Sequence, residues 1–267
     1  MPKKSKTPSL TLRDLSTTSF SADVLTNAFN VGEELGDATP FRIEASYSRD
    51  PDEHEFYLLR VGHALAQVLA LCDQLEDIPA YIKHARVTKA LRSAGIHRHD
   101  LLVYHLENYF VRCQSLYDRT LTLVDAVFHL QNAPTQMKDF VVLGNLKVDR
   151  TDVPKRVKAL GKLLQRYRTV RNEVAHQRTL QTDEIRRLEM YGILIAAREQ
   201  KSDPPDSRHT TLQEIRHEEE AWIICSKVKE FDAFNRNLSD AMHGLLDEIA
   251  PHYTTQERRL RHVLEKP

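Results

Sequence analysis

The 267 residues carry 38 basic and 38 acidic side chains, so the formal net charge at pH 7 is zero. Glycine is scarce, at eight residues, and charged residues make up 28% of the chain, which favours long helices over a turn-rich β fold. The chain has no run of 18 apolar residues and no apolar segment after its basic N-terminus, so we expect neither a membrane-spanning helix nor secretion. Its length suits one large domain or two small ones.

The N-terminal part of the sequence is expected to differ from the rest. Residues 1–9 are polar, basic and contain proline, which predicts a disordered tail. Residues 10–54 are expected to form an N-terminal arm with one short helix, from Ala22 to Leu35. Alternation of apolar and polar residues from Phe41 to Tyr47 predicts a short strand or an extended segment.

Helical periodicity begins at Glu55 and continues through most of the remaining chain. A first helix is predicted from Glu55 to Leu75, and Pro79 is expected to stop it. A second helix is predicted from Ala80 to Ser93, ended by Gly95. The third and longest is predicted from Asp100, as its N-cap, to about Leu130.

The middle of the chain is less regular. Residues 137–148 predict a small hairpin or a loop, because a Gly-Asn pair separates two apolar runs. Pro154 is suited to the first turn of the helix that follows. Thr182 or Asp183 is expected to cap the next helix, which reaches about Arg198.

The C-terminal part predicts a linker and one more long helix. Residues 200–211 are polar and contain proline, as is typical of a flexible surface linker. A helix is predicted from Leu212 to Ile249, with Ile215 and Trp222 in its core face, and Pro251 is expected to end it. A further basic helix could follow at residues 254–266. We therefore predict an all-α fold, with residues 55–267 as a single antiparallel bundle of about six helices.

The sequence gives no sign of a metal or cofactor site. Its three cysteines lie far apart inside apolar helical patterns, at Cys72, Cys113 and Cys225. They are expected to be buried thiols of a protein in the reducing cytoplasm. His97 and His99 with Asp100 lack a fourth metal ligand, and glycine-rich nucleotide loops are absent. We therefore expect no bound metal and no cofactor.

The stretch from Gln165 to His176 holds the residues that most need a functional explanation. A stripe of apolar residues leads into it at helical spacing, at Val157, Leu160, Leu164 and Tyr167. At about 100° per residue the same stripe reaches Arg171, where a core residue is expected. Because an arginine is rarely buried without a partner, Arg171 predicts either a structural ion pair, a snorkelling stem or a functional site.

His176 lies about 140° around a continuous helix from Arg171, so the two side chains would not meet on one straight helix. They converge if the helix ends or kinks between them, or if a second copy of the chain brings its own pair across a two-fold axis. The polar residues 177–182 break the helical pattern, which places His176 at or near a helix end.

This stretch resembles a known family. Arg171-Asn172-x-x-x-His176, with Ala175 before the histidine and an amphipathic helix leading in, is similar to the Arg-x4-6-His signature of the HEPN superfamily. Two other Arg-x4-His instances in the chain lack the asparagine. The resemblance implies a metal-independent helical ribonuclease in which two motifs meet in a dimer, often in phage defence or toxin systems. Where some of these toxins carry a tyrosine that is adenylylated, the chain has Arg178, so that regulation is not implied.

The residue types of the motif suit metal-free RNA cleavage. His176 can act as general acid or base near neutral pH, and Arg171 can grip phosphate oxygens and stabilise their developing charge. Asn172, four residues before His176, could orient the imidazole or the phosphate. Cleavage needs both an acid and a base, so one histidine per chain is one too few and two chains supply the pair.

Two further sets of residues are candidates for RNA binding. Residues 154–178 contain eight Lys or Arg and one acid, a basic run that would attract a polyanion unless it is only a solvated helix face. Arg168 and Arg178 belong to this run. On the polar side of the third helix, Arg112 and Arg119 line either a solvent-facing stripe, a second wall of the RNA site or a dimer seam.

Together these features predict a cytoplasmic homodimer that cleaves single-stranded or loop RNA, with an antitoxin or defence protein as a further partner and no membrane. A non-catalytic HEPN-like module that binds RNA, a nucleotide or a protein is the alternative. A helical scaffold in which the motif is a coincidence is a third reading.

Overall fold

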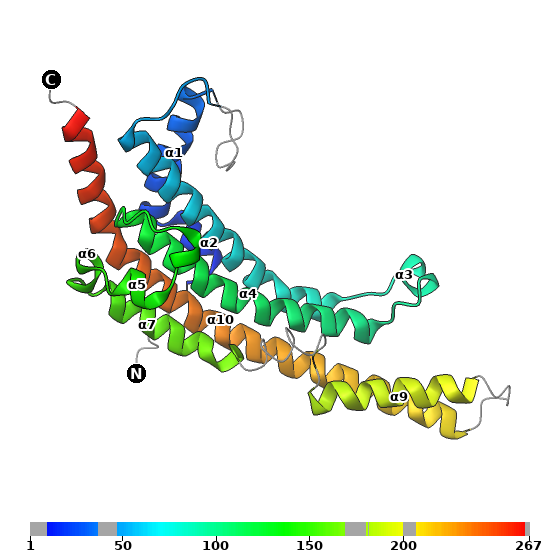
Figure 1. Cartoon of the computed structure of the whole chain (residues 1–267). Helices are drawn as coiled ribbons and strands as arrows, with labels where there is room; N and C mark the ends of the chain where they lie inside the picture. The colour runs from blue at the N-terminus through cyan, green and yellow to red at the C-terminus, as the bar shows by residue number, and fades with distance from the viewer. Residues whose placement is uncertain (1–9, 37–46, 169–179, 181, 200–206, 265–267) are drawn as a thin grey trace, which may run out of the picture. The chain divides into compact units, whose positions relative to one another are not determined.

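The computed structural model describes residues 10–36, 47–168, 180, 182–199 and 207–264, and every regular element among them is a helix (Figure 1). The predicted all-α fold is confirmed. The predicted tail at residues 1–9, and the predicted strand at 41–47 apart from Tyr47, lie outside the described residues.

The chain divides into two compact units. Unit 1 comprises residues 1–76, 113–166 and 235–267, and unit 2 comprises residues 77–112 and 167–234. Three long helices contribute a segment to each unit: α2 (Glu53–His84), α4 (Arg98–Val127) and α10 (Ser207–Leu264).

The N-terminal arm is largely helical. A short 3-10 helix, η1 (Arg13–Thr17), is followed by α1 (Ser19–Glu34). Thr18 caps α1, because its Oγ1 accepts a hydrogen bond of 3.2 Å from the backbone N–H of Ser21. The helix therefore begins three residues before the predicted start at Ala22.

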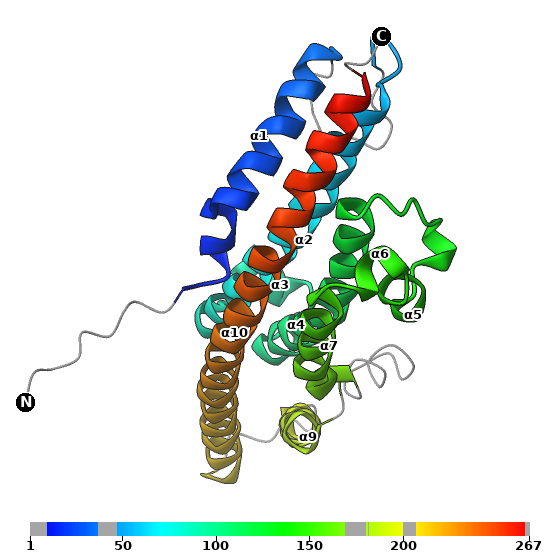
Figure 2. The same cartoon turned by 90° about the vertical axis from the view of Figure 1, so that its left-hand side faces the viewer.

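Within unit 1, α1 packs beside the first part of α2 and the last part of α10, as Figures 1 and 2 show. The three helices meet at Tyr253. Its ring lies 5.8 Å from that of Phe20 in an edge-to-face contact and stacks at 5.9 Å on Tyr57. Its hydroxyl accepts a hydrogen bond of 3.1 Å from Asn27. The N-terminal arm is thus attached to the core of unit 1.

α2 does not end before Pro79, as predicted, but continues through it to His84. A proline removes the hydrogen bond to the carbonyl four residues earlier, which here belongs to Leu75. The side-chain amide of Asn235 donates a hydrogen bond of 2.8 Å to that carbonyl oxygen. The predicted helix at 80–93 is therefore wrong, because its first residues belong to α2, residues 85–88 are not helical, and α3 (Lys89–Ser93) follows them.

α4 begins at Arg98 rather than after Asp100. Asp100 occupies the third helical position, and its Oδ2 accepts a hydrogen bond of 2.7 Å from the backbone N–H of His97. This is the reciprocal half of a capping box, so the predicted N-cap role of Asp100 is wrong although the residue does stabilise the helix start. Gly95, with φ of 78°, follows α3 as predicted.

Residues 137–148 form neither the predicted hairpin nor a loop. The segment contains two short helices, α5 (Asp139–Leu143) and α6 (Leu146–Asp149), and a 3-10 turn, η2 (Pro134–Gln136), precedes it. Asn145 caps α6, because its Oδ1 accepts a hydrogen bond of 3.0 Å from the N–H of Lys147. The Gly-Asn pair therefore separates two short helices instead of two strands.

α7 (Val153–Leu164) starts with Pro154 in its first turn, as predicted, and a 3-10 turn, η3 (Gln165–Tyr167), follows it. The predicted apolar stripe is confirmed, because Val157, Leu160, Leu164 and Tyr167 are all buried. A Cβ on Gly161 would lie 3.0 Å from the Tyr117 ring, so this glycine lets α7 pack closely against α4 in unit 1.

The last two helices differ in length from their predictions. α9 (Asp183–Glu199) is capped by Thr182, whose Oγ1 accepts a 3.4 Å hydrogen bond from Ile185. α10 includes residues 207–211, which were predicted as linker, and it passes through Pro251 instead of ending there. The carbonyl that Pro251 leaves without a helical partner belongs to Asp247, an exposed residue, so water can satisfy it.

Three residues predicted to be buried are exposed. Ile215 and Trp222 on α10 are 39% and 56% exposed, and Cys225 is exposed while Cys72 and Cys113 are buried. All three lie on the first part of α10, whose apolar residues are spread around the helix and therefore cannot all face one core.

Among the helices that the structure describes, α2 alone is long and apolar enough to cross a membrane. In its most apolar window, 61% of the residues are buried inside the protein. That burial is what a core helix shows.

Candidate functional site

The predicted catalytic residues Arg171, Asn172 and His176 lie outside the described residues, and so does Arg178. The structure does describe the residues on either side of the motif, and we call the segment between Tyr167 and Leu180 the motif stretch. Tyr167 precedes it and Leu180 follows it, and both belong to unit 2. The geometry of these two residues is therefore the structural information that bears on the motif.

Tyr167 is fixed by an aromatic cluster and a hydrogen bond. Its ring lies 5.7 Å from Tyr109 and 5.1 Å from Phe110 on α4, and 4.8 Å from Phe234 on α10. Its hydroxyl donates a hydrogen bond of 3.0 Å to Glu230 Oε1 on α10. With 4% of its surface exposed, Tyr167 is a buried anchor at the entrance to the motif stretch.

Leu180 is a second anchor. It is 1% exposed, and its backbone N–H donates a hydrogen bond of 2.7 Å to Glu107 Oε1 on α4. Glu107 lies two residues before Tyr109 and three before Phe110, which contact Tyr167. Both ends of the stretch that carries the motif are therefore held on the same part of α4.

The described candidates for RNA binding differ in their exposure. Arg168 and Arg119 are exposed, whereas Arg112 is half-buried and its Nη1 donates a hydrogen bond of 2.6 Å to Asn108 Oδ1. Arg112 also contributes to lowering the pKa of His105, for which burial is the larger cause. Arg112 belongs to unit 2 and Arg119 to unit 1.

α7 carries a basic surface in unit 1. Three exposed lysines, Lys155, Lys158 and Lys162, lie on one side of the helix with Thr151, Pro154 and Ala159, and these six residues line a cavity of about 480 Å³. The lining contains no carboxylate. Such a surface attracts a polyanion. Lys158 and Lys162 thus lie on a different side of α7 from the buried stripe.

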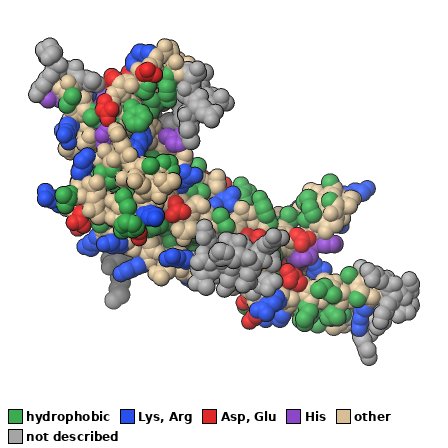
Figure 3. Space-filling view, in the orientation of Figure 1, with side chains coloured by type: hydrophobic (Ala, Val, Ile, Leu, Met, Phe, Trp, Pro, Cys, Tyr) green, Lys and Arg blue, Asp and Glu red, His purple; other side chains and the backbone are tan. Residues whose placement is uncertain are grey.

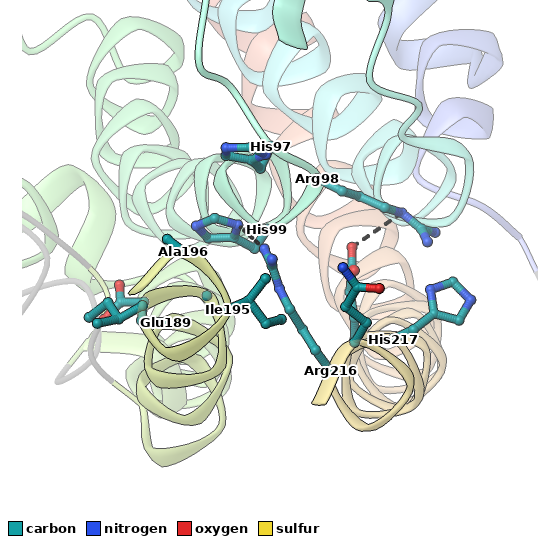
Figure 4. Close-up of a pocket in the computed structure, with 12 residues that line it drawn as sticks. His97, Arg98, His99, Glu189, Ile195, Ala196, Arg216 and His217 are labelled. Carbon is teal, nitrogen blue, oxygen red and sulfur yellow. Dashed lines mark hydrogen bonds and ion pairs between the residues drawn. The ribbon is translucent and has the colours of Figure 1, made fainter. Parts of the chain in front are cut away.

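A second cavity, of about 790 Å³, lies in unit 2 between the start of α4, α9 and the first part of α10. Figure 4 shows the His97 and His99 rings parallel to each other and Arg216 extending from α10 towards His99. Arg216 Nη2 lies 2.8 Å from His99 Nδ1, and His99 Nε2 lies 3.0 Å from Asp100 Oδ1. Both ring nitrogens of His99 are thus engaged.

The environment of His99 favours the neutral form of its ring. Burial lowers its pKa, Arg216 and His97 add to the effect, and Asp100 opposes it. On the other side of the cavity, Arg98 forms an ion pair of 3.3 Å with the buried Glu220 (Figure 4). These contacts join the start of α4 to α10 within unit 2.

Sequence reasoning missed Arg216 and Glu220 as partners of the residues around His99. Arg216 and His99 are 117 positions apart, and nothing in the linear pattern joins them. The structure also bears on the metal hypothesis for His97 and His99. Among the residues that the structure describes, no three His, Cys, Asp or Glu side chains form a group that could hold a metal ion.

Comparison with protein families decides the membership of the chain. A family model described as Cthe2314-like HEPN matches residues 57–203, which is more than half of the sequence and includes Arg171 and His176. The chain belongs to the HEPN superfamily. No curated protein and no solved structure was found to match it.

Membership of the HEPN superfamily indicates the kinds of function that the domain can have. HEPN domains serve as nucleases or RNA-binding modules in defence or toxin systems, and they often dimerise. The HEPN span includes Tyr167, Leu180 and Glu107, so the two anchors of the motif stretch lie within the HEPN domain. The exposed basic surface of α7 lies within the same span.

Proposed function

We propose that this HEPN protein is a metal-independent endoribonuclease that acts as a homodimer. In this proposal Arg171 binds the scissile phosphate, His176 is the general acid or base, and Asn172 orients the imidazole or the phosphate. The observation that carries it is the family match across the motif, since the match covers Arg171 and His176 together with both anchors.

The proposed reaction needs one histidine from each copy. One His176 takes the proton from the ribose 2′-hydroxyl, and the 2′-oxygen attacks the phosphorus. The bond from phosphorus to the 5′-oxygen breaks, and the second His176 donates a proton to that leaving oxygen. Arg171 stabilises the charge on the pentacovalent phosphate. The products are a 2′,3′-cyclic phosphate and a free 5′-hydroxyl.

The anchors support this chemistry, because catalytic groups must be held by a rigid scaffold. Tyr167 and Leu180 are both buried, and both are bonded to residues of long helices. RNA would be bound by exposed arginines, for which Arg168, Arg178, Arg112 and Arg119 are the candidates. The exposed lysines of α7 would add positive potential that attracts the substrate.

We further propose that the protein works in the cytoplasm, in phage defence or as a toxin, where an antitoxin or a defence protein would be its partner. Neither a metal nor a cofactor is needed for the proposed reaction. The phosphate charge is met by arginine, and the proton transfers are carried by histidine.

The test compares three proteins incubated with mixed cellular RNA in the presence of a chelator. Wild type should cleave the RNA and leave 2′,3′-cyclic phosphate ends, and His176→Ala should be inactive with an unchanged melting temperature. His262→Ala, which removes an exposed histidine near the C-terminus, is the matched control and should cleave like wild type. An RNA pool left intact by wild type, but retained by it on a filter, would favour a non-catalytic RNA-binding module.

A further inference from the structure

Large apolar side chains are exposed on α9 and on the first part of α10. Ile193, Met190 and Trp222 are 68%, 58% and 56% exposed, and Leu194 and Ile215 are 44% and 39% exposed. Figure 3 shows hydrophobic side chains on the surface of α9. Exposed apolar groups gathered in this way mark an interaction surface more often than scattered single ones do.

An ion pair shows which of these side chains share a face. Arg187 on α9 donates two hydrogen bonds, of 2.8 and 2.6 Å, to Glu219 Oε1 on α10. Residues three, four or seven positions apart lie on the same side of a helix. Met190 and Leu194 follow Arg187 by three and seven residues. Ile215 precedes Glu219 by four, and Trp222 follows it by three. The four apolar side chains therefore surround the ion pair on one face, which we call the α9–α10 face.

α9 is apolar on two opposite sides. Ile185, Leu188 and Ile195 are buried within unit 2, and about half a turn around the helix Met190 and Leu194 are exposed, whereas Ile193 lines the cavity beside α10. A helix with a single apolar stripe needs one packing partner, whereas a helix that is apolar all round is normally buried. The outer side of α9 therefore has the composition of a surface that is covered in an assembly.

The charges on the α9–α10 face indicate what covers it. Arg187 and Glu219 neutralise each other, and Arg186 beside them is paired with Asp183 at 2.9 Å. A nucleic acid or an anionic membrane would require a net positive surface, which this face lacks. An isologous pair of identical faces is self-complementary if Arg187 of each copy lies near Glu219 of the other. Trp, Met and Arg are also the residue types enriched in protein interfaces.

We propose that the α9–α10 face binds the same face of a second copy of this chain. The inference rests on the proposed function, because a composite site of two motifs is incomplete without a second copy. α9 begins three residues after the anchor Leu180, so this interface lies close along the chain to the end of the motif stretch. The second copy would thereby bring its own Arg171 and His176.

The first test measures the molecular mass in solution by light scattering on a sizing column. Wild type should be a dimer, and the double variant Leu194→Glu with Trp222→Glu should be a monomer with unchanged helical content. Phe140→Glu is the control, because Phe140 is 71% exposed on α5 in unit 1 and its replacement should leave the dimer intact. A double variant that remains dimeric, or a wild type that is monomeric, would overturn the proposal.

A second test uses the ion pair. Arg187→Glu and Glu219→Arg should each weaken self-association at least tenfold, since each creates like-charge contacts within and between copies. An equimolar mixture of the two variants should form a heterodimer, because both contacts across the two-fold axis then join opposite charges. One contact joins the introduced carboxylate to the introduced guanidinium, and the other joins the unchanged Arg187 to the unchanged Glu219. Failure of the mixture to associate more tightly than either variant alone would refute the two-fold pairing of these residues.

Cleavage assays on the same proteins separate the two proposals. A dimeric wild type that leaves all RNA intact would refute the proposed ribonuclease and leave the interface standing. A monomeric double variant that cleaves RNA as fast as wild type would keep the interface but refute the composite site. Loss of both dimer and cleavage in the double variant, with both retained in Phe140→Glu, is the expected result.

Discussion

The side-chain amide of Asn235 on α10 hydrogen-bonds, at 2.8 Å, the carbonyl oxygen of Leu75 on α2. This is the carbonyl that Pro79 leaves without its helical N–H. Asn235 is 3% exposed, so a residue 160 positions away supplies the missing donor inside the protein. The contact explains how α2 continues through a proline.

Replacing Asn235 with leucine should destabilise the protein by about 1–3 kcal/mol, because a buried carbonyl then loses its donor. In a Pro79→Ala background the helix itself supplies an N–H to Leu75, so the same replacement should cost less. Urea unfolding of the two single variants and the double variant measures this coupling. Equal costs of Asn235→Leu in both backgrounds would show that the bond does not compensate for the proline.

Asp125 is a buried charged residue of unit 1 that should contribute to stability. It is fully buried, pairs with Arg60, and its Oδ1 accepts a 2.7 Å hydrogen bond from the Asn132 amide. Asp125→Asn should cost about 3–5 kcal/mol, since it leaves the Arg60 guanidinium without its anion. Asp149→Asn, at an exposed position, is the control and should change the unfolding midpoint little. Similar midpoints for both variants would contradict the prediction.

Glu107 should control how firmly the motif stretch is held. Glu107→Leu removes the acceptor for the Leu180 N–H, whereas Glu107→Gln keeps a carbonyl oxygen in its place. Loss of a charge-assisted hydrogen bond of about 1.5–3 kcal/mol raises local opening at least tenfold. Brief digestion with trypsin should therefore cut faster after Arg168, Arg171 or Arg178 in Glu107→Leu than in Glu107→Gln. Identical digestion rates would mean that this bond does not hold the stretch.

His99 should make stability depend on pH below neutrality. Burial, with Arg216 and His97, lowers its pKa in the folded protein below the ordinary value of 6.5. The unfolded chain then binds a proton at a higher pH than the folded protein does. The contribution of His99 to the free energy of unfolding is therefore complete above about pH 6.5. It is lost as the pH falls from there through the lowered pKa of the folded protein.

The measurement is the free energy of unfolding at pH 7.5 and at pH 5 for wild type and His99→Gln. Other groups titrate in both proteins, so the difference between the two pH dependences isolates His99. The variant should lose less stability on acidification than wild type does. A variant that loses as much as wild type would show that His99 keeps an ordinary pKa in the folded protein.

Local sequence signals were enough to predict the helical class, several helix starts and the motif. Thr182 caps α9 and Pro154 opens α7 because capping and a fixed φ act within one turn of chain. The apolar residues from Val157 to Tyr167 are buried because their 3.6-residue spacing places them on one side of the helix, and that side packs against the core. The Arg171 and His176 motif was likewise recognised from the sequence, and the HEPN family match includes it.

Features that depend on residues far apart in the sequence became visible only in the folded chain. Pro79 does not end α2 because Asn235 reaches Leu75, and Trp222 and Ile215 are exposed because the neighbouring helices cover other sides of α10. The anchoring of Leu180 by Glu107 joins residues 73 positions apart. Periodicity shows which side chains share a face of one helix, but a hydrogen bond or a buried face also needs a partner, and tertiary packing supplies it.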